Sequence, residues 1–503
     1  MAPDGEAPNP AFRSRWALVL LAAALLAGGL AGAAGAGLLG TGAGAQVAEG
    51  GAEAEAVAVA EAGSELTPTS SPPASFPPSE PVPLTGLQRK DMFGTAVALS
   101  ADGSVLAASA PYAAGDRGQV SAFLRQGNET DGGEGGSAAW WVPLGQVLEG
   151  SVAGDFLGGG ARYPGPADSA ALDLSSDGTV LAAAAAGEEG SGAARVHVFA
   201  LDRSSRLWVP RGDPIPVEDG VAASLSLGRD GTVLAVGCPL CSGTDGLVRL
   251  YAWDGDGGHW GQVGNDVGGG LSVQAGQSVA IGGLGAGGDV VRVALGAPYA
   301  SARVGLWGGR VRLLEWGGSG GPSRDVGLGV GAYGGRSGDR FGTSVAASAD
   351  GTVLAVGADM WDRAAANLPR GGGEVRVLRW NATSAGWEAM GQVLGGEAGG
   401  RFGAALSLAD GGTVLAATGL GDPDEFFPVR WQARAFLHDE ATALWEPLGG
   451  TEVGGTRQIP PTVLPGSSVD MSGDGRFLAV GAPESDANGW QSGEVRVFRL
   501  HVP

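Results

Sequence analysis

Short apolar runs separated by polar turns recur along most of the chain, and one copy, at 340–396, shows the pattern in full. A first run of apolar and small residues ends at the turn dipeptide Asp350-Gly351, and a second apolar run follows it. Asp-Gly favours the tight turn of a hairpin, and runs of this length indicate strands. A third segment alternates apolar and polar residues, as a half-exposed strand does. The predicted strands of this copy lie at 341–347, 352–357, 374–380 and 387–393.

The same unit recurs at intervals of about sixty residues, which is typical of a propeller blade. A strand such as TVLAVG follows each turn, and a third strand such as VRVLRW follows in turn. Seven copies predict an all-β protein, a seven-bladed β-propeller of four-stranded antiparallel blades. The turn dipeptides are Asp102-Gly103, Asp177-Gly178, Asp230-Gly231, Gly288-Asp289 (a degenerate copy), Asp350-Gly351, Asp410-Gly411 and Asp474-Gly475.

The last repeat lacks a fourth strand, because the chain stops at Pro503 just past its third strand. A segment before the first repeat, PVPLTGL at 81–87, resembles VPLGQVL at 142–148 in the first one. A ring of blades has to close, and an open sheet edge invites pairing with other chains. We therefore expect 81–87 to supply the missing outer strand of the last blade.

Two short motifs resemble the FG-GAP repeat family, which includes the seven-bladed propeller of integrin α subunits. FG occurs at Phe93-Gly94, Phe341-Gly342 and Phe402-Gly403, and GAP at 296–298 and 481–483. The resemblance covers about 84–502 and implies a propeller with a role in binding or adhesion. The calcium loop of integrin-type repeats is reduced here to one carboxylate, whereas calcium takes six to eight oxygens. The resemblance is therefore to the calcium-free type, and we expect neither a metal nor a cofactor.

The N-terminal region predicts export. Arg13 and Arg15 precede the apolar run 16–26, and small residues with A-x-A-like sites follow, as in a secretory signal peptide. An uncleaved single-pass anchor stays open, because 16–39 carries no charge and is long enough to span a bilayer. Either way we expect the protein to be secreted or at the cell surface. The predicted domains are a signal peptide or anchor at 1–45, a disordered Ala/Glu- and Ser/Pro-rich linker at 46–80, and the propeller at 81–503.

Charge and cysteine content narrow the functions further. A net charge of −22 argues against nucleic-acid partners, whose binding depends on Lys and Arg. The two cysteines, Cys238 and Cys241, predict a local disulfide or two inert thiols, since a zinc site needs a second ligand pair. The sequons at Asn128 and Asn381 both fall in the turn after a third strand and predict glycosylation of an exported chain.

The loops between second and third strands carry the candidate binding residues. In the resembled propellers partners dock on this face, and aromatic residues at loop tips fit interface hot spots. Packing over the ends of the blades is the other interpretation. Tryptophans that begin fourth strands, such as Trp208, Trp260 and Trp445, are predicted to be framework residues. The candidates are Tyr112, Asp116, Tyr299, Trp307, Trp361, Asp362, Asp424, Phe426, Phe427, Asp486 and Trp490.

These features predict a binding or adhesion module for a protein or glycan partner, and not an enzyme. The alternative is a polysaccharide hydrolase or lyase with paired carboxylates at the mouth of the ring. No catalytic motif supports it, and no carboxylate pair stands out in the sequence. The four histidines lie at different blade positions, so they predict no metal cluster.

Overall fold

The structure is a computed structural model whose described part belongs to one compact unit, Ser75–Pro503. The predicted signal and linker lie outside the described residues, as do Asn128, Trp361, Asp362, Asp424, Phe426 and Phe427. Within the described part, no helix is long and apolar enough to cross a membrane. The described residues are 84–503 except 127–139, 160–170, 188–193, 218–223, 269–272, 285–289, 302–305, 318–323, 326–337, 361–371, 385, 397–399, 421–430, 453–457, 460–463 and 466.

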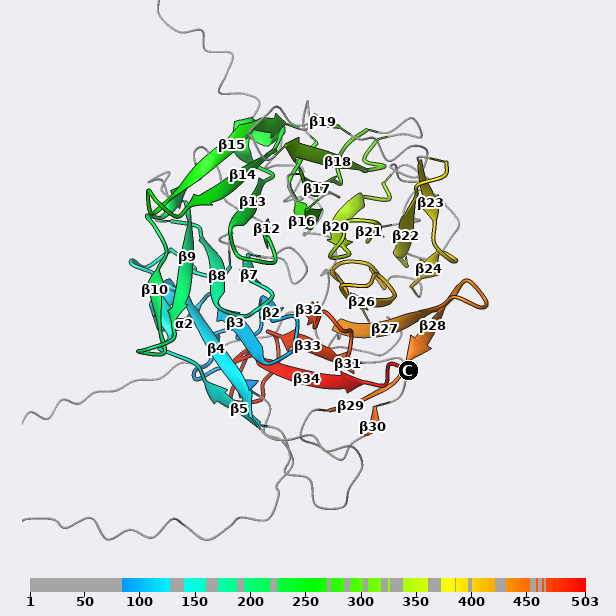
Figure 1. Cartoon of the computed structure of the whole chain (residues 1–503). Coiled ribbons are helices and arrows are strands. Elements are labelled where there is room, and N and C mark those ends of the chain that lie inside the picture. Colours follow the sequence, from blue (N-terminus) through cyan, green and yellow to red (C-terminus); the bar gives the residue numbers. More distant parts are fainter. Residues whose placement is uncertain are drawn as a thin grey trace, which may run out of the picture. The chain divides into compact units, whose positions relative to one another are not determined.

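Seven antiparallel sheets form a ring, which confirms the predicted seven-bladed propeller (Figure 1). Strands follow one another from the centre outward. Blade 1 contains β2 (Val97–Leu99), β3 (Val105–Ala110), β4 (Gln119–Gln126) and β5 (Trp140–Pro143). Blade 2 contains β7 (Leu172–Leu174), β8 (Val180–Ala185), β9 (Arg195–Asp202) and β10 (Leu207–Pro210). Blade 3 contains β12 (Ser224–Leu227), β13 (Val233–Cys238), β14 (Leu247–Asp254) and β15 (His259–Gly268).

The remaining blades follow the same order. Blade 4 contains β16 (Ser278–Leu284), β17 (Val290–Ala297), β18 (Arg310–Gly317) and β19 (Arg324–Asp325). Blade 5 contains β20 (Phe341–Ala347), β21 (Val353–Ala358), β22 (Glu374–Asn381) and β23 (Gly386–Ala389). Blade 6 contains β25 (Leu406–Leu408), β26 (Val414–Leu420), β27 (Trp431–Asp439) and β28 (Leu444–Leu448). Blade 7 contains β32 (Ser468–Met471), β33 (Phe477–Ala482) and β34 (Glu494–Leu500).

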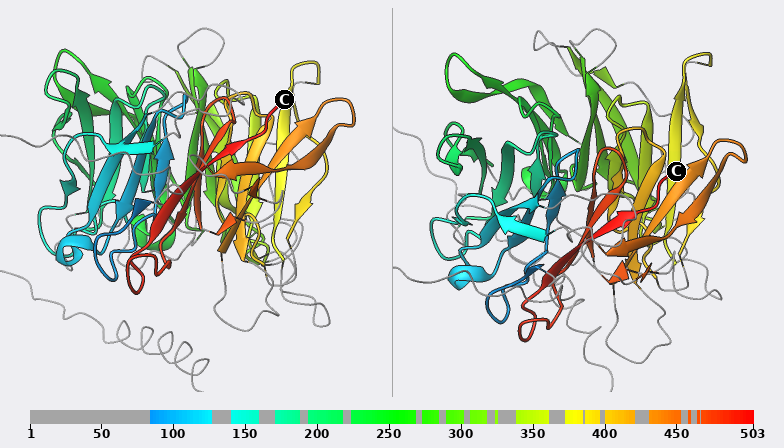
Figure 2. Two further views of the ribbon diagram at one scale, coloured as in Figure 1. Left: turned by 90° about the horizontal axis from the view of Figure 1, so that it is seen from below. Right: turned by 60° about the horizontal axis from the view of Figure 1, so that its bottom comes forward.

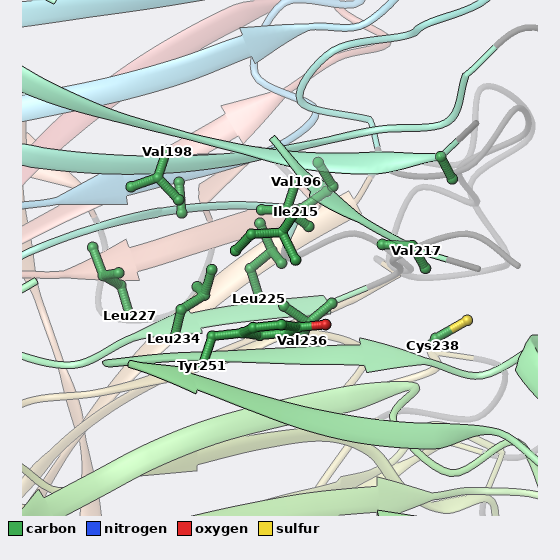
Figure 3. Packing of buried hydrophobic residues seen from close by; sticks show 14 of the residues in the cluster. Val196, Val198, Ile215, Val217, Leu225, Leu227, Leu234, Val236, Cys238 and Tyr251 are labelled. Carbon is green, nitrogen blue, oxygen red and sulfur yellow. The ribbon is translucent and has the colours of Figure 1, made fainter. Parts of the chain in front are cut away.

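The hydrophobic core consists of clusters that each lie between two neighbouring blades, and the described residues form seven of them. Between blades 2 and 3, Val196 and Ile215 of one sheet face Leu234 and Val236 of the next (Figure 3). The second strands are buried on both faces, which explains their continuous apolar runs. A single blade therefore buries its apolar faces only when a blade stands on each side of it.

The FG and GAP motifs meet at the blade interfaces. Gly94 has a φ of +88°, and its carbonyl oxygen lies against Gly481, where a β-carbon would sit only 2.1 Å from it. The Ser468 hydroxyl donates a hydrogen bond of 2.7 Å to the same carbonyl. Gly357 and Gly403 make the same contact between blades 5 and 6. The glycine of each motif is thus required by a close backbone approach between neighbouring blades.

The outer strands are joined by tryptophans, as predicted for these framework residues. Trp208 and Trp445 are buried, and the Nε1 of each donates to a carbonyl of the preceding blade, at 2.9 and 2.7 Å. The amide of Gln392 donates to the Trp445 carbonyl and accepts from its backbone N–H, both at 2.8 Å. Gln146 holds Trp208 in the same way. These contacts fix the periphery of the ring.

The N-terminal segment closes the ring, although not in the predicted register. The strand β1 (Leu84–Thr85) pairs with β34, with Leu84 opposite Val495. In blade 1 the corresponding place beside the third strand is taken by β6 (Leu148–Glu149). The segment LTG at 84–86 therefore matches LEG at 148–150, and not VPLG at 142–145. The rest of the outer edge of blade 7 comes from β29 (Gly450–Glu452), which follows blade 6 and pairs with residues up to Leu500. β29 also pairs with β30 (Gln458–Ile459).

Two further sequence predictions need correction. The predicted fourth strand 387–393 is shorter, at Gly386–Ala389, and a separate two-residue strand follows it and pairs with the third strand. Such second pieces are β6, β11 (Ile215–Pro216), β24 (Leu394–Gly395) and β31 (Leu464–Pro465). In blade 6 the hairpin glycine is Gly412, with a φ of +69° and a hydrogen bond to the Ala409 carbonyl, and not Gly411. Asp410 therefore occupies the position before the usual turn aspartate.

The other Asp-Gly turns are structural, as predicted. Asp350 Oδ1 accepts from the Ser348 hydroxyl at 2.7 Å and from the Thr352 backbone at 2.9 Å. Gly351 follows with a φ of +65°. Although burial alone would raise the pKa of Asp350, the hydrogen bonds from Ser348 and Thr352 outweigh it and lower the pKa.

Removal of residues 78–90 should lower the melting temperature of the whole ring. The deletion removes β1 and exposes the edge of β34 at the blade interface that closes the ring. The measurement is thermal denaturation of this variant beside a control that lacks only 1–77. Equal melting temperatures for the two variants would contradict the role of β1 in closure.

Candidate functional site

The ring has two faces with different loops. The loop face carries the connections between second and third strands, including α2 (Ala113–Asp116) and η2 (Cys241–Thr244). The turn face carries the Asp-Gly turns at the opposite ends of the strands. In Figure 2 the strands run between the two faces, with α2 and the loop before β34 at the same end. The described binding candidates therefore lie on the loop face, and the sequon at Asn381 lies toward the turn face.

In the loop of blade 4, Trp307 forms an exposed aromatic platform. Its side chain is 57% exposed and Leu306 beside it is 67% exposed. The backbone holds Trp307 at a φ of +58°, and the Arg340 N–H donates to the Trp307 carbonyl at 3.1 Å. The Tyr299 ring lies edge-on to Trp307 with 6.5 Å between ring centroids, and the Arg340 guanidinium is 5.1 Å from the Tyr299 ring. The platform is thus exposed and fixed at the same time.

A buried carboxylate anchors this platform from below. Asp359 is fully buried, and its Oδ2 lies 3.5 Å from Arg340 Nη1 and 2.6 Å from Arg401 Nη2. The Thr343 hydroxyl donates to Asp359 Oδ1 at 3.0 Å. In the sequence, Asp359 occupies the position that is the proline of the GAP motif in other repeats. Arg340 and Arg401 each come directly before the phenylalanine of an FG motif, in blades 5 and 6. The ion pairs therefore connect the loop-face ends of blades 5 and 6.

A second exposed cluster lies where the ring closes. Trp490 of blade 7 is 49% exposed, and the Lys90 ammonium lies 5.0 Å from its ring. Leu87 nearby in the closing segment is 77% exposed. Asp486 is exposed and accepts from the Gln491 backbone at 2.8 Å. Trp307 and Trp490 belong to blades 4 and 7, so the structure places them in two separate clusters.

The remaining described candidates have structural partners. Tyr112 is partly buried and its ring contacts Phe156 edge-on at 5.3 Å, so it packs between blades 1 and 2. Asp116 is exposed with a φ of +64°, and its carbonyl accepts from Gly154 and Phe156. Cys238 and Cys241 form a disulfide with 5.4 Å between Cα atoms, both buried in the core between blades 2 and 3.

Asn381 lies in the turn between β22 and β23 and already has side-chain partners. Its Nδ2 donates to both oxygens of Glu388 at 3.0 Å. Its Oδ1 accepts from the Thr383 backbone at 2.8 Å. The hydrogen bonds from Asn381 and Ser384 lower the pKa of Glu388. A glycan on Asn381 would have to displace part of this hydrogen bonding, and its use stays a prediction.

The inner strands surround a central cavity of about 230 Å³. Its walls combine aliphatic side chains with hydroxyls, and two carboxylates, Asp173 of β7 and Asp470 of β32, face it. They are the two ionisable side chains among the described residues that line it. Both keep partial solvent exposure through the cavity although they lie deep within the ring.

Each carboxylate also connects its blade to the next one. Asp470 Oδ2 accepts from the Leu99 N–H of blade 1 at 2.7 Å, and its Oδ1 accepts from the Ser407 hydroxyl of blade 6 at 2.9 Å. Asp173 Oδ2 accepts from the Leu227 N–H of blade 3 at 2.7 Å. The innermost strand of a blade has no neighbour on its channel side, so these side chains satisfy backbone donors that would otherwise be unpaired.

Their position changes the acidity of both groups. Burial raises the pKa of Asp173 to about 7, against the hydrogen bond from Leu227, and the nearby charge of Asp470 raises it further. Burial also raises the pKa of Asp470 to about 6, against the hydrogen bonds from Leu99 and Ser407. The two carboxyl groups therefore titrate near neutral pH, where ordinary aspartates are fully ionised.

The turn face narrows this channel. In the described part of the turn face, backbone hydrogen bonds join the turns of neighbouring blades. Ala101 donates to Ser176, Ser176 donates to Arg229, and Gly473 donates to Ala101, each at 2.8 Å. Above these bonds, Arg229 of blade 3 forms an ion pair with Asp410 of blade 6. These blades stand on opposite sides of the ring, so the pair crosses the mouth.

Sequence reasoning missed Asp173, Asp470 and the Arg229–Asp410 pair. The sequence did contain a signal for Asp173 and Asp470. Each lies two residues before the serine of its turn motif, and at this position other repeats carry Ala or Ser, such as Ala98 and Ser226. A carboxylate in such a strand is unusual. The Arg229–Asp410 contact joins residues 181 positions apart, and no local pattern reports it.

The comparisons with known proteins found solved structures that align with most of this chain at low sequence identity. No protein-family model matches the chain, and no curated protein matches it. A solved structure of hydrazine synthase from Kuenenia stuttgartiensis aligns with 84% of this chain and 97% of its own, at 15% identity and a TM-score of 0.46. A candidate 6-phosphogluconolactonase from Bacteroides uniformis aligns with 74% of this chain and 87% of its own, at 12% identity and a TM-score of 0.44. Such distant likenesses say nothing about activity.

Replacement Asp173→Asn should stabilise the protein at pH 8 and have little effect near pH 4. The pKa of Asp173 is higher in the folded state than in the unfolded state. As the pH rises above the unfolded pKa, ionisation of Asp173 therefore lowers the stability of the folded protein. Each pKa unit corresponds to about 1.4 kcal/mol, and partial loss of hydrogen bonding offsets some of the gain, so we expect about 1–3 kcal/mol at pH 8. The measurement is urea denaturation at both pH values.

The matched control is Asp350→Asn, for which the sign is opposite. The pKa of Asp350 is lowered, so its contribution to stability is present above the unfolded pKa and is lost on acidification. This variant should be less stable than wild type at pH 8. A destabilised Asp173→Asn protein at pH 8 would show that its hydrogen bonds outweigh the cost of its charge.

Proposed function

We propose that the protein is a secreted or cell-surface binding module of the FG-GAP type, whose loop face engages a protein or glycan partner. The observation that carries the proposal is the Trp307 platform. A large aromatic side chain that is 57% exposed, yet fixed by its backbone and by Tyr299, loses little conformational entropy on binding. Tryptophan, tyrosine and arginine are also the residues most enriched in binding hot spots.

The FG-GAP assignment rests on the role of the motif residues. The glycines of FG and GAP contact each other across blade interfaces, including the one that closes the ring. The presence of these glycines is therefore explained by close backbone packing between blades, and this explanation does not depend on calcium. A glycan partner would stack on Trp307 or Trp490, since sugar rings present an apolar face to aromatic side chains, whereas a protein partner would bury Leu306 as well.

A hydrolase or lyase is the second candidate function, and the raised pKa values of Asp173 and Asp470 favour it. A carboxyl group with a pKa of about 7 can act as a general acid near neutral pH. The same oxygens accept backbone N–H groups from neighbouring blades, which gives them a structural role without catalysis. The binding module therefore remains the first candidate.

Replacement Trp307→Ala should weaken partner binding by about tenfold or more, the usual cost of removing an aromatic hot spot. A glycan and protein array with the purified protein would first identify a partner. Titration of that partner against Trp307→Ala and Trp490→Ala then measures the contribution of each cluster. Leu444→Ala is a suitable control, because Leu444 is 41% exposed but begins a fourth strand at the turn face.

Unchanged affinity in both tryptophan variants would refute binding through these clusters. Turnover of a polysaccharide that is abolished by Asp173→Asn or Asp470→Asn, with folding intact, would favour the hydrolase or lyase instead. The two functions thus depend on different residues and can be separated by the same set of variants.

A further inference from the structure

The chain has a single lysine, and the structure places it on an exposed aromatic ring. Lys90 is the only lysine in the sequence, and it directly follows Arg89 in the segment that closes the ring. Its ammonium group lies 5.0 Å from the centre of the Trp490 ring, and its backbone N–H donates to the Trp490 carbonyl at 2.9 Å. Trp490 is 49% exposed, and both basic side chains are exposed as well. Two cations and one aromatic ring therefore share one part of the loop face.

The backbone holds Lys90 in a conformation that favours glycine. Arg89 and Lys90 are the central residues of a tight turn. A hydrogen bond of 3.4 Å from the Asp91 N–H to the Gln88 carbonyl closes this turn. Lys90 has a φ of +70°, where turns usually carry glycine or asparagine because other residues are strained. Since such strain is found mostly at functional positions, the lysine side chain has a reason other than the local fold.

The closing turn also differs from its surroundings in its charges. Among the described residues, no carboxylate forms an ion pair with Arg89 or Lys90. By contrast, Arg117 Nη2 of blade 1 lies 3.4 Å from Glu149, and the two arginines below the Trp307 platform share one buried carboxylate. In a chain with a net charge of −22, this basic patch is an exception. Its charge complements an anionic partner.

The neighbouring polar groups favour a saccharide over an acidic peptide. Asp486 and Asn488 lie in the same loop as Trp490 and are exposed. Their side-chain oxygens are acceptors that suit hydroxyl groups, whereas the Asp486 carboxylate repels a run of acidic side chains. Asn488 Nδ2 also donates to the Gly86 carbonyl at 3.0 Å, which fixes the loop against the closing segment. The surface is therefore held in place before a partner binds.

We propose that the closing cluster, which consists of Arg89, Lys90, Asp486, Asn488 and Trp490, binds an anionic saccharide. The sugar ring stacks on the exposed part of Trp490, and its carboxylate or sulfate group binds to Lys90 and Arg89. Hydrogen bonds between such an anion and a cationic side chain are stronger than those between neutral groups. The inference rests on the proposed function, because it names the class of partner for one part of the loop face.

Titration of the full protein with oligogalacturonate, which is carboxylated, and with a sulfated dextran oligosaccharide tests the proposal. We expect saturable binding of at least one of them, weakened by sodium chloride, and no binding of neutral dextran. Lys90→Gln and Trp490→Ala should each weaken this binding about tenfold or more. Arg203→Gln removes a charge from an exposed turn at the opposite face and should bind as wild type does.

Lysine chemistry provides a second measurement, because the chain has one lysine side chain. Acetylation of Lys90, followed by mass spectrometry, should be slower when the saccharide is bound. Lys90→Gly should be at least as stable as wild type in thermal denaturation, since glycine adopts the positive φ without strain. The same variant should bind the saccharide more weakly, which separates loss of binding from loss of folding.

The outcomes distinguish this inference from the proposed function. Absence of binding by both anionic saccharides, or equally tight binding of hexaglutamate, would overturn the inference. Unchanged saccharide affinity in Lys90→Gln and Trp490→Ala would overturn it as well. In each of these cases, an array partner whose affinity falls in Trp307→Ala would still support the proposed function. Trp307→Ala should leave saccharide binding unchanged, because Trp307 belongs to the separate cluster of blade 4.

Discussion

The structure depends on one constraint: no blade can bury its apolar faces without a neighbour on each side. Each described core cluster is shared by two blades, so stability comes from interfaces and not from individual sheets. An open array would leave two faces exposed, and closure removes both. The contact of blade 7 with blade 1 is therefore as apolar as the others, with Phe93 and Val97 against Val495 and Val497.

This constraint acts at every radius of the ring. At the periphery, tryptophans such as Trp445 reach the carbonyls of the preceding blade. In the middle, Gly94 and Gly481 allow two backbones to approach closely. At the centre, Asp470 and Asp173 satisfy donors of inner strands that have no further strand to pair with. Because each contact links consecutive blades, a change at one interface affects the closure of the whole ring.

Trp307, which carries the proposed binding surface, lies in a loop that this constraint leaves exposed. Loops that do not join blades can vary, and in blade 4 one of them presents Trp307 on a rigid base formed through Arg340 and Asp359. The central cavity is a consequence of closure itself, because the inner strands cannot meet at the axis. It places side chains from distant parts of the chain together. The proposed partner surface and the central cavity thus arise from separate features of one fold.

The sequence by itself determined the number of blades, the order of strands and the structural role of the Asp350 turn, because these depend on local periodicity and turn chemistry. It also indicated Trp307 and Trp490 as candidates, since they stand out in loops. It missed the register of β1, the use of β29 in blade 7, the meeting of Asp173 and Asp470 at one cavity and the Arg229–Asp410 ion pair. These were decided only by the tertiary structure, because ring closure brings together residues that no local pattern relates.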